Sequence, residues 1–213
     1  LPWMDPSIAS PAALAAPAPG VSPPPEDPAA LPGCDHCNLL VIVIDTLRVD
    51  HLGFAGYARP TSPGLDAFAA DARRYDNCIA QATWTVPSTA SLLCSAYPGT
   101  HQLTFGPGDT DDWYALGDGV TTLAEVLDGE GYETAALIGN PVLRPRLGLD
   151  RGFDAYTLES DEEAIADAAR VLARWEEGGS FLYLHLLGPH PGLEPPPPYD
   201  TLFGPPAGPL PAD

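Results

Sequence analysis

The feature that most constrains this chain is a run of six apolar residues, Leu39–Ile44, that ends in the carboxylate of Asp45. Val and Ile make up most of the run, Asn38 precedes it, and charged residues follow it. This pattern is typical of a strand that is covered on both faces, as in a parallel sheet flanked by helices. The sequence therefore predicts an α/β fold with Asp45 at the carboxyl end of a strand.

That position gives Asp45 a candidate function. Open α/β sheets bind ligands at the carboxyl ends of their strands, where a carboxylate can reach a metal ion. The alternative is that Asp45 only caps the strand or begins a turn.

A second segment, TWTVPSTASLLCSAYPGTH, begins at Thr83. Proline is favoured in the first turn of a helix, so Pro87 predicts that Thr85 lies at or next to a helix N-cap. The free N–H groups and the positive end of the helix dipole would then suit an anionic phosphoryl or sulfuryl group. The alternative is that the Thr85 hydroxyl only caps the helix.

Further elements follow from periodicity and from turn residues. We expect helices over residues 62–74, 87–95, 122–128 and 162–175, and strands over Glu133–Ile138 and residues 181–187. Strands that alternate with helices imply crossover connections and a parallel sheet.

The order of these pieces resembles the N-terminal part of the sulfatase family, within the alkaline phosphatase superfamily. The resemblance is carried by NLLVIVIDTLRVDHLGFAGYARPTSPGLDAFAADARRYDNCIAQ, TWTVPSTASLLCSAYPGTH, TTLAEVLDGEGYETAALIGN and FLYLHLLGPHPGLEPPPPYD. It implies an α/β sandwich, mainly a parallel sheet flanked by helices, with a metal site at the strand ends. There a nucleophile at a helix start attacks the sulfur or phosphorus of an ester.

The resemblance also assigns roles to residues of this chain. Asp45 matches a metal carboxylate, Thr85 matches the nucleophile, and His190, in GPHPG, matches a histidine that lines the substrate site. Arg48 and Ser88 are candidates on the substrate side. A local ion pair with Asp50 is the alternative for Arg48.

The chain departs from the family pattern in its nucleophile segment. True sulfatases place a Cys or Ser at the position of Thr85, because that residue is oxidised to formylglycine. Relatives that use an unmodified Thr, such as phosphoethanolamine transferases and lipoteichoic acid synthases, act on phosphate esters. Thr46 stands where the family has a second Asp, and Thr89 where it has an Arg.

The nine basic residues are all arginines, so the lysines that hold sulfate in sulfatases have no counterpart here. We therefore expect a metal-dependent hydrolase or transferase that acts on a phosphate or sulfate ester through Thr85, rather than a formylglycine sulfatase. The divalent ion would be Ca or Mg in a sulfatase-like site, and Zn or Mn in a phosphotransferase-like site.

An inactive or truncated remnant of the fold is the competing interpretation. The second metal cluster of the family, a D-H-G-like segment, has no match in residues 154–213. We therefore expect a sheet that is incomplete at its C-terminal end and a fragment that is inactive alone. A haloacid-dehalogenase mechanism is disfavoured, because Leu47 stands where that pattern requires a second Asp.

The ends of the chain predict three parts. Residues 1–36 are rich in Pro and Ala, residues 37–190 hold the partial α/β domain, and residues 191–213 form a Pro-rich loop. No apolar run reaches the ~18 residues that span a bilayer. The resemblance implies a periplasmic or extracellular location.

The net charge excludes one class of function, and the cysteines and histidines have expected structural roles. The formal charge of −20 excludes a sequence-independent nucleic-acid binder. The resemblance implies a small anionic ester as the substrate. Cys34 and Cys37 form a C-x-x-C for which we expect a short disulfide, with zinc, redox chemistry or free thiols as alternatives. Three histidines, His51, His101 and His185, are expected to be loop or interior residues rather than ligands.

Overall fold

The protein was described from a computed structural model, in which residues 36–104, 115–176, 178–192 and 195–203 are placed. Its sheet has four parallel strands in the order β1-β4-β2-β3. The strands are β1 (Leu39–Ile44), β2 (Glu133–Ile138), β3 (Ala155–Leu158) and β4 (Ser180–Leu186). The predicted fold class is confirmed, because the sheet is parallel and helices flank it.

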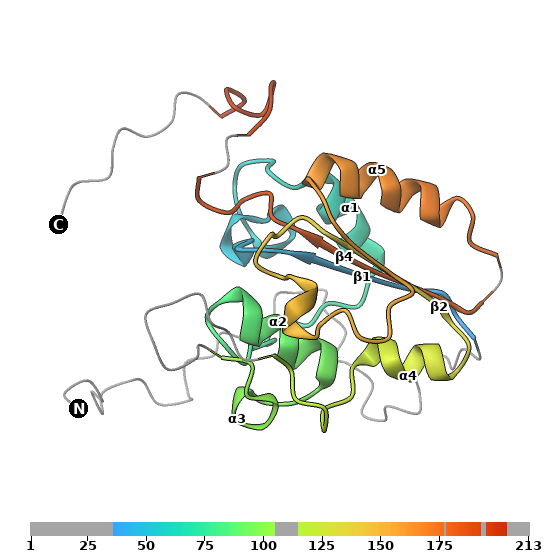
Figure 1. The fold of residues 1–213 in the computed structure, drawn as a ribbon. Coiled ribbons are helices and arrows are strands. Elements are labelled where there is room, and N and C mark those ends of the chain that lie inside the picture. The colour runs from blue at the N-terminus through green and yellow to red at the C-terminus, as the bar shows by residue number, and fades with distance from the viewer. Residues whose placement is uncertain (1–35, 105–114, 177, 193–194, 204–213) are drawn as a thin grey trace, which may run out of the picture.

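Five α-helices lie within the described residues, namely α1 (Pro63–Asp71), α2 (Thr85–Cys94), α3 (Pro98–His101), α4 (Leu123–Gly129) and α5 (Asp161–Leu172). The described residues also contain 3-10 turns: η3 (Val49–His51) and η4 (Gly53–Ala55) lie between β1 and α1, and η5 (Pro145–Leu147) lies between β2 and β3. Helix α5 covers one face of the sheet, and α2 and α4 cover the other (Figure 1). Among these described helices none has the length and apolarity that a bilayer crossing requires.

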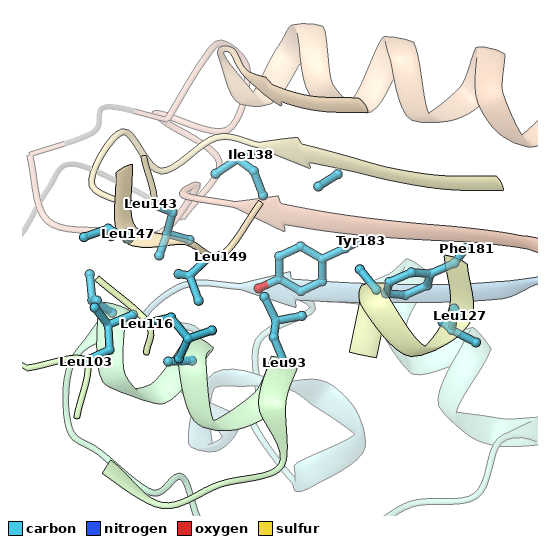
Figure 2. Packing of buried hydrophobic residues seen from close by; sticks show 14 residues of the cluster. Leu93, Leu103, Leu116, Leu127, Ile138, Leu143, Leu147, Leu149, Phe181 and Tyr183 are labelled. Carbon is cyan, nitrogen blue, oxygen red and sulfur yellow. The ribbon is translucent and has the colours of Figure 1, made fainter. Parts of the chain in front are cut away.

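Strand β4 supplies core residues to both faces, because successive side chains of a strand point to opposite sides. Phe181 and Tyr183 point toward α2 and α4, where Leu93 and Leu127 belong to the same cluster (Figure 2). Leu182 and Leu184 face α5 and pack with Ala164 and Ala168. The position of β4 inside the sheet explains why all these side chains are buried.

Strand β1 differs from the prediction. It lies at the edge of the described sheet, and its side chains that face the main core are only partly buried. Val41 and Val43 pack against the main core, whereas Leu40 is 40% exposed and Ile42 is 52% exposed. Helix α5 packs on β2 and β4, so among the described elements it does not cover this side of β1. An apolar run indicates that a strand can be buried, but it does not show whether the strand is central or at the edge of the sheet.

The predicted helices and strands are present, with shifted ends. Helix α2 begins at Thr85 rather than at residue 87, and α5 begins and ends earlier than predicted. Strand β3 was not predicted, because its four residues are too few to show a period, and at the sheet edge three of them are exposed and Tyr156 is half-buried.

The cysteine prediction is tested in part. Cys37 is disulfide-bonded, and the other cysteine of the motif, Cys34, lies outside the described residues. Cys78 and Cys94 are free thiols.

A capping box fixes the start of α4 and leads to a stability prediction. Thr122 is 1% exposed, its hydroxyl accepts from the N–H of Glu125, and it donates to the carbonyl of Arg151 at 2.8 Å. We expect Thr122→Ala to lower the free energy of unfolding by about 1–2 kcal/mol, since both bonds are lost. Urea unfolding measures this. Thr121→Ala, at the exposed neighbouring position, is the control and should stay within about 0.5 kcal/mol of wild type; equal losses in both variants would contradict the capping role.

Candidate active site

Two predicted site residues meet at the carboxyl edge of the sheet. Asp45 directly follows β1, and Thr85 is the first residue of α2. The Thr85 hydroxyl donates a hydrogen bond of 2.9 Å to Oδ2 of Asp45. Residues forty positions apart are thus joined at one point, and the Thr85 hydroxyl is not used as a helix cap.

Asp45 Oδ2 receives two further donors. The Asn140 amide donates to it at 2.7 Å, and the His185 ring nitrogen Nε2 lies 3.5 Å away. Burial by itself would raise the pKa of Asp45, but the hydrogen bonds from Thr85, Asn140 and His185 outweigh it and hold the pKa below the ordinary value. Asp45 is therefore a carboxylate anion at neutral pH.

His185 is held by its other ring nitrogen. Burial lowers the pKa of His185, although Asp45 opposes this, and burial raises the pKa of Tyr183. Both side chains are therefore neutral, and the Tyr183 hydroxyl lies 2.9 Å from Nδ1 of His185. With Tyr183 donating to Nδ1, the proton of His185 sits on Nε2 and faces Asp45. His185 is interior, as predicted, but its contact with Asp45 was missed.

Asn140 was also missed by the sequence analysis. It lies two residues past β2 and is 4% exposed. Its Oδ1 accepts from the N–H of Val142 at 3.0 Å, which fixes the amide so that Nδ2 points at Asp45. The available signal was a polar residue just after a predicted strand, since the ends of parallel strands meet at one edge.

A cavity of about 400 Å³ opens over these groups. Its lining includes Asp45, Thr85, Ser88, His185 and His190. The structure thus brings four of the five predicted site residues to one cavity. Arg48, the fifth, is not in its lining.

Arg48 instead pairs with Asp50 through an N–H···O contact of 2.6 Å, and both side chains are more than half exposed. This is the ion pair that the sequence analysis gave as the alternative. An exposed pair of this kind contributes little to stability.

The backbone next to Asp45 is strained. Thr46, which also lines the cavity, has φ of 56°, in the left-handed region that β-branched residues avoid. Asp and Asn tolerate this region better. Thr46 stands where the family resemblance predicts a second Asp, so a backbone that suits Asp carries Thr in this chain, and such strain is commonly found at functional sites.

The start of α2 adds a partial positive charge to the cavity. Trp84, the N-cap residue, provides no side-chain cap, and Thr85 and Ser88 of the first turn line the cavity. Unpaired N–H groups at a helix start bind anions. The cavity therefore combines a hydroxyl, a carboxylate and a site for an anion.

The described residues fit one side of a divalent metal site. Oδ1 of Asp45 accepts no hydrogen bond from the described part of the chain, and carboxylate and hydroxyl oxygens are ligands that divalent cations accept. Within the described ranges no group of three or more His, Cys, Asp or Glu side chains is arranged to hold a metal ion. A complete ligand set would need residues from elsewhere in the protein.

A parallel sheet with a carboxylate at a strand end and a hydroxyl at a helix start fits the α/β class that the sequence predicts. Comparison with known proteins gives the family. The Sulfatase family profile matches residues 37–207, most of the chain, and the chain therefore belongs to the sulfatase family.

Curated relatives agree with this assignment. The chain is 33% identical over 98 residues to an ulvan-active sulfatase of Formosa agariphila, covering 46% of this chain and 18% of the relative. It is also 33% identical over 106 residues to arylsulfatase A of Bos taurus, covering 50% and 21%. The matched segments thus span about a fifth of the length of these relatives.

Solved structures share the fold. The phosphonate monoester hydrolase of Agrobacterium radiobacter superposes with a TM-score of 0.60 at 20% identity, covering 83% of this chain and 45% of that one. The C-terminal periplasmic domain of EcEptC from Escherichia coli, in complex with Zn, gives a TM-score of 0.58 at 18% identity, covering 82% and 52%.

Proposed function

We propose that the full-length protein is a sulfatase-family hydrolase or transferase that acts on a small phosphate or sulfate ester, with Thr85 as the nucleophile. The observation that carries this proposal is a 2.9 Å hydrogen bond. The hydroxyl of Thr85, the first residue of α2, donates it to Asp45. The attacking hydroxyl and the negative charge that develops on the ester would then both lie at the N-terminus of α2.

The residues divide the chemistry as follows. Thr85 Oγ1 attacks the phosphorus or sulfur while its proton passes to Oδ2 of Asp45, a new O–P or O–S bond forms, and the bond to the leaving oxygen breaks, so that the departing alcohol takes up a proton from solvent. Water or an acceptor alcohol then displaces Thr85 from the adduct, and Asp45 returns the proton to the hydroxyl. Asp45 accepts the hydrogen bond of the hydroxyl and so aims the oxygen lone pairs into the cavity. The N–H groups at the start of α2 stabilise the non-bridging oxygens as charge develops.

Several groups support these two residues. Asn140 and His185 hold Asp45 by donating to the same oxygen, which limits its rotation. His190 stands at the cavity wall, where it can contact the ester. A divalent cation bound through Asp45 would lower the pKa of the Thr85 hydroxyl and neutralise substrate charge.

A phosphate ester is the favoured substrate. An unmodified Thr85 cannot serve as a formylglycine precursor of the kind that true sulfatases use, and the chain contains no lysine to hold sulfate oxygens. The fold is shared with sulfatases as well as with a phosphonate monoester hydrolase, so the choice of phosphate rests on Thr85, and the zinc-bound periplasmic domain supports the use of a divalent metal. Disulfide-bonded Cys37 supports a periplasmic or extracellular location.

The test is a substrate and metal panel on the full-length gene product. We expect turnover of p-nitrophenyl phosphate or a phosphonate monoester to exceed turnover of p-nitrophenyl sulfate, to cease on chelation, and to return with one of Zn, Mn, Mg or Ca. The measurement is the initial rate with each ester and each metal ion. Absence of turnover with every ester and every metal would reject the enzyme and favour an inactive member of the family.

A further inference from the structure

A carboxylate outside the cavity ties the chain that leaves β4 to α5. Asp161 is the first residue of α5, and its side chain accepts from two backbone N–H groups just past β4. Oδ1 accepts from Leu187 at 2.8 Å, and Oδ2 accepts from Gly188 at 2.6 Å. Each oxygen of Asp161 thus binds the backbone that leaves β4.

This contact is not needed to cap α5. The N-cap is Ser160, whose hydroxyl accepts from the N–H of Glu163, and the Glu163 carboxylate accepts from the N–H of Ser160 in a complete capping box. The helix start is therefore satisfied without Asp161. Its carboxylate serves the segment after β4.

Glycine at position 139 makes the contact fit. Gly139 directly follows β2, and its N–H donates to the carbonyl of His185 at 2.7 Å. A Cβ at Gly139 would lie 1.9 Å from Oδ1 of Asp161 and 3.1 Å from the carbonyl oxygen of His185. The Asp161 side chain can relieve that overlap at the lowest cost if it rotates away from Leu187 and Gly188.

The anchored segment carries a predicted catalytic residue into the cavity. The N–H of His190 donates to the carbonyl of Leu187 at 2.8 Å, so residues 187–190 form one turn. Asp161 holds the first two residues of that turn, and His190, at its end, lines the cavity with Asp45 and Thr85.

We propose that Asp161 is a positioning residue, accommodated by Gly139, that fixes the turn of residues 187–190 and thereby sets the place of His190 against the substrate. The inference rests on the proposed function, because it assigns a step to His190. Asp161 is not part of the cavity lining, and it holds the turn through its two backbone hydrogen bonds. Burial lowers the pKa of the lining residue His185 and the charge of Asp161 opposes this, and Asp161→Asn removes that charge while it keeps an acceptor oxygen.

The experiment compares Asp161→Ala, Asp161→Asn and Gly139→Ala with Ser160→Ala in the full-length protein. Ser160→Ala weakens the same helix start without touching the turn and is the matched control. We expect Asp161→Ala and Gly139→Ala to reduce kcat/KM by roughly 10- to 100-fold, since small displacements of a substrate-positioning group have effects of that size. Asp161→Asn, which keeps one acceptor oxygen, should fall between, and Ser160→Ala should match wild type.

A double-mutant cycle isolates the route through His190. If Asp161 acts only by placing His190, then Asp161→Ala in a His190→Ala background causes no further loss of kcat/KM. A loss equal to the product of the two single effects would overturn the inference. Gly139→Ala keeps the carboxylate, so it provides the same test if Asp161→Ala fails to fold.

Amide hydrogen exchange provides a readout that does not need turnover. The N–H groups of Leu187 and Gly188 should exchange on the order of tenfold faster or more in Asp161→Ala, and remain protected in Ser160→Ala. Unchanged protection in Asp161→Ala would overturn the anchoring role and leave the proposed function standing. An inactive wild type with fast exchange in Asp161→Ala would instead reject the proposed function, and with it the step assigned to His190, while the anchoring of the turn would stand.

Discussion

Thr85→Val in the full-length protein is expected to lower kcat/KM by about 10⁴-fold or more, because removal of a covalent nucleophile has effects of that order in other enzymes. Valine keeps the branched shape of threonine but lacks the hydroxyl, so Asp45 loses one donor and the ester loses its attacking atom. Steady-state rates on the best ester of the panel measure the effect.

Two controls separate chemistry from folding. Thr85→Ser keeps a hydroxyl at the first residue of α2 and should retain far more activity than Thr85→Val. Thr100→Ala changes an exposed threonine of α3 and should behave as wild type. If Thr85→Val turns over substrate as fast as Thr100→Ala, Thr85 is not the nucleophile.

The second large effect is expected at Asp45. Two substitutions there separate the contribution of its negative charge from the contribution of its hydrogen bonds. Asp45→Asn can place its amide oxygen where Oδ2 stands and still accept from Thr85, Asn140 and His185. It removes the negative charge that a cation requires. We expect a loss of metal affinity and a fall in kcat/KM on the order of 10³-fold, with little change in the free energy of unfolding.

Asp45→Ala removes the acceptor as well. Its side chain is 11% exposed in the wild type, so the buried donors around it would lose their partner. We expect an additional loss of about 1–3 kcal/mol in the free energy of unfolding. Calorimetric metal titration and urea unfolding of both variants measure the two effects. Wild-type metal affinity in Asp45→Asn would show that Asp45 is not a ligand.

Much of the fold is readable from local pattern. The apolar runs of β1, β2 and β4 and the apolar spacing along α1 and α5 are properties of short segments, and each was predicted as the right type of element. The predictions failed where burial or pairing depends on neighbouring elements of the fold. The burial of β1 depends on which strand and helix stand beside it, and the four-residue β3 exists because β2 offers it a partner.

The site divides in the same way. Asp45 and Thr85 could be selected because each carries a local signal, a strand end for one and a proline-marked helix start for the other. Asn140 carries only the weaker signal of a polar residue just after a predicted strand, and His185 carries none. A histidine in an apolar strand predicts an interior side chain, and nothing in the segment of residues 181–187 shows that Asp45 lies beyond its ring.

By itself, the sequence determined the class of fold and selected Asp45 and Thr85 as candidate site residues, because these follow from local hydrophobic pattern, turn residues and functional groups. Only the tertiary structure decided which groups converge on Asp45. The strand order β1-β4-β2 places the ends of β4 and β2 beside the end of β1, so that His185 and Asn140 reach the same carboxylate oxygen as Thr85. Strand order depends on long-range packing between segments far apart in the chain, and no single segment encodes it.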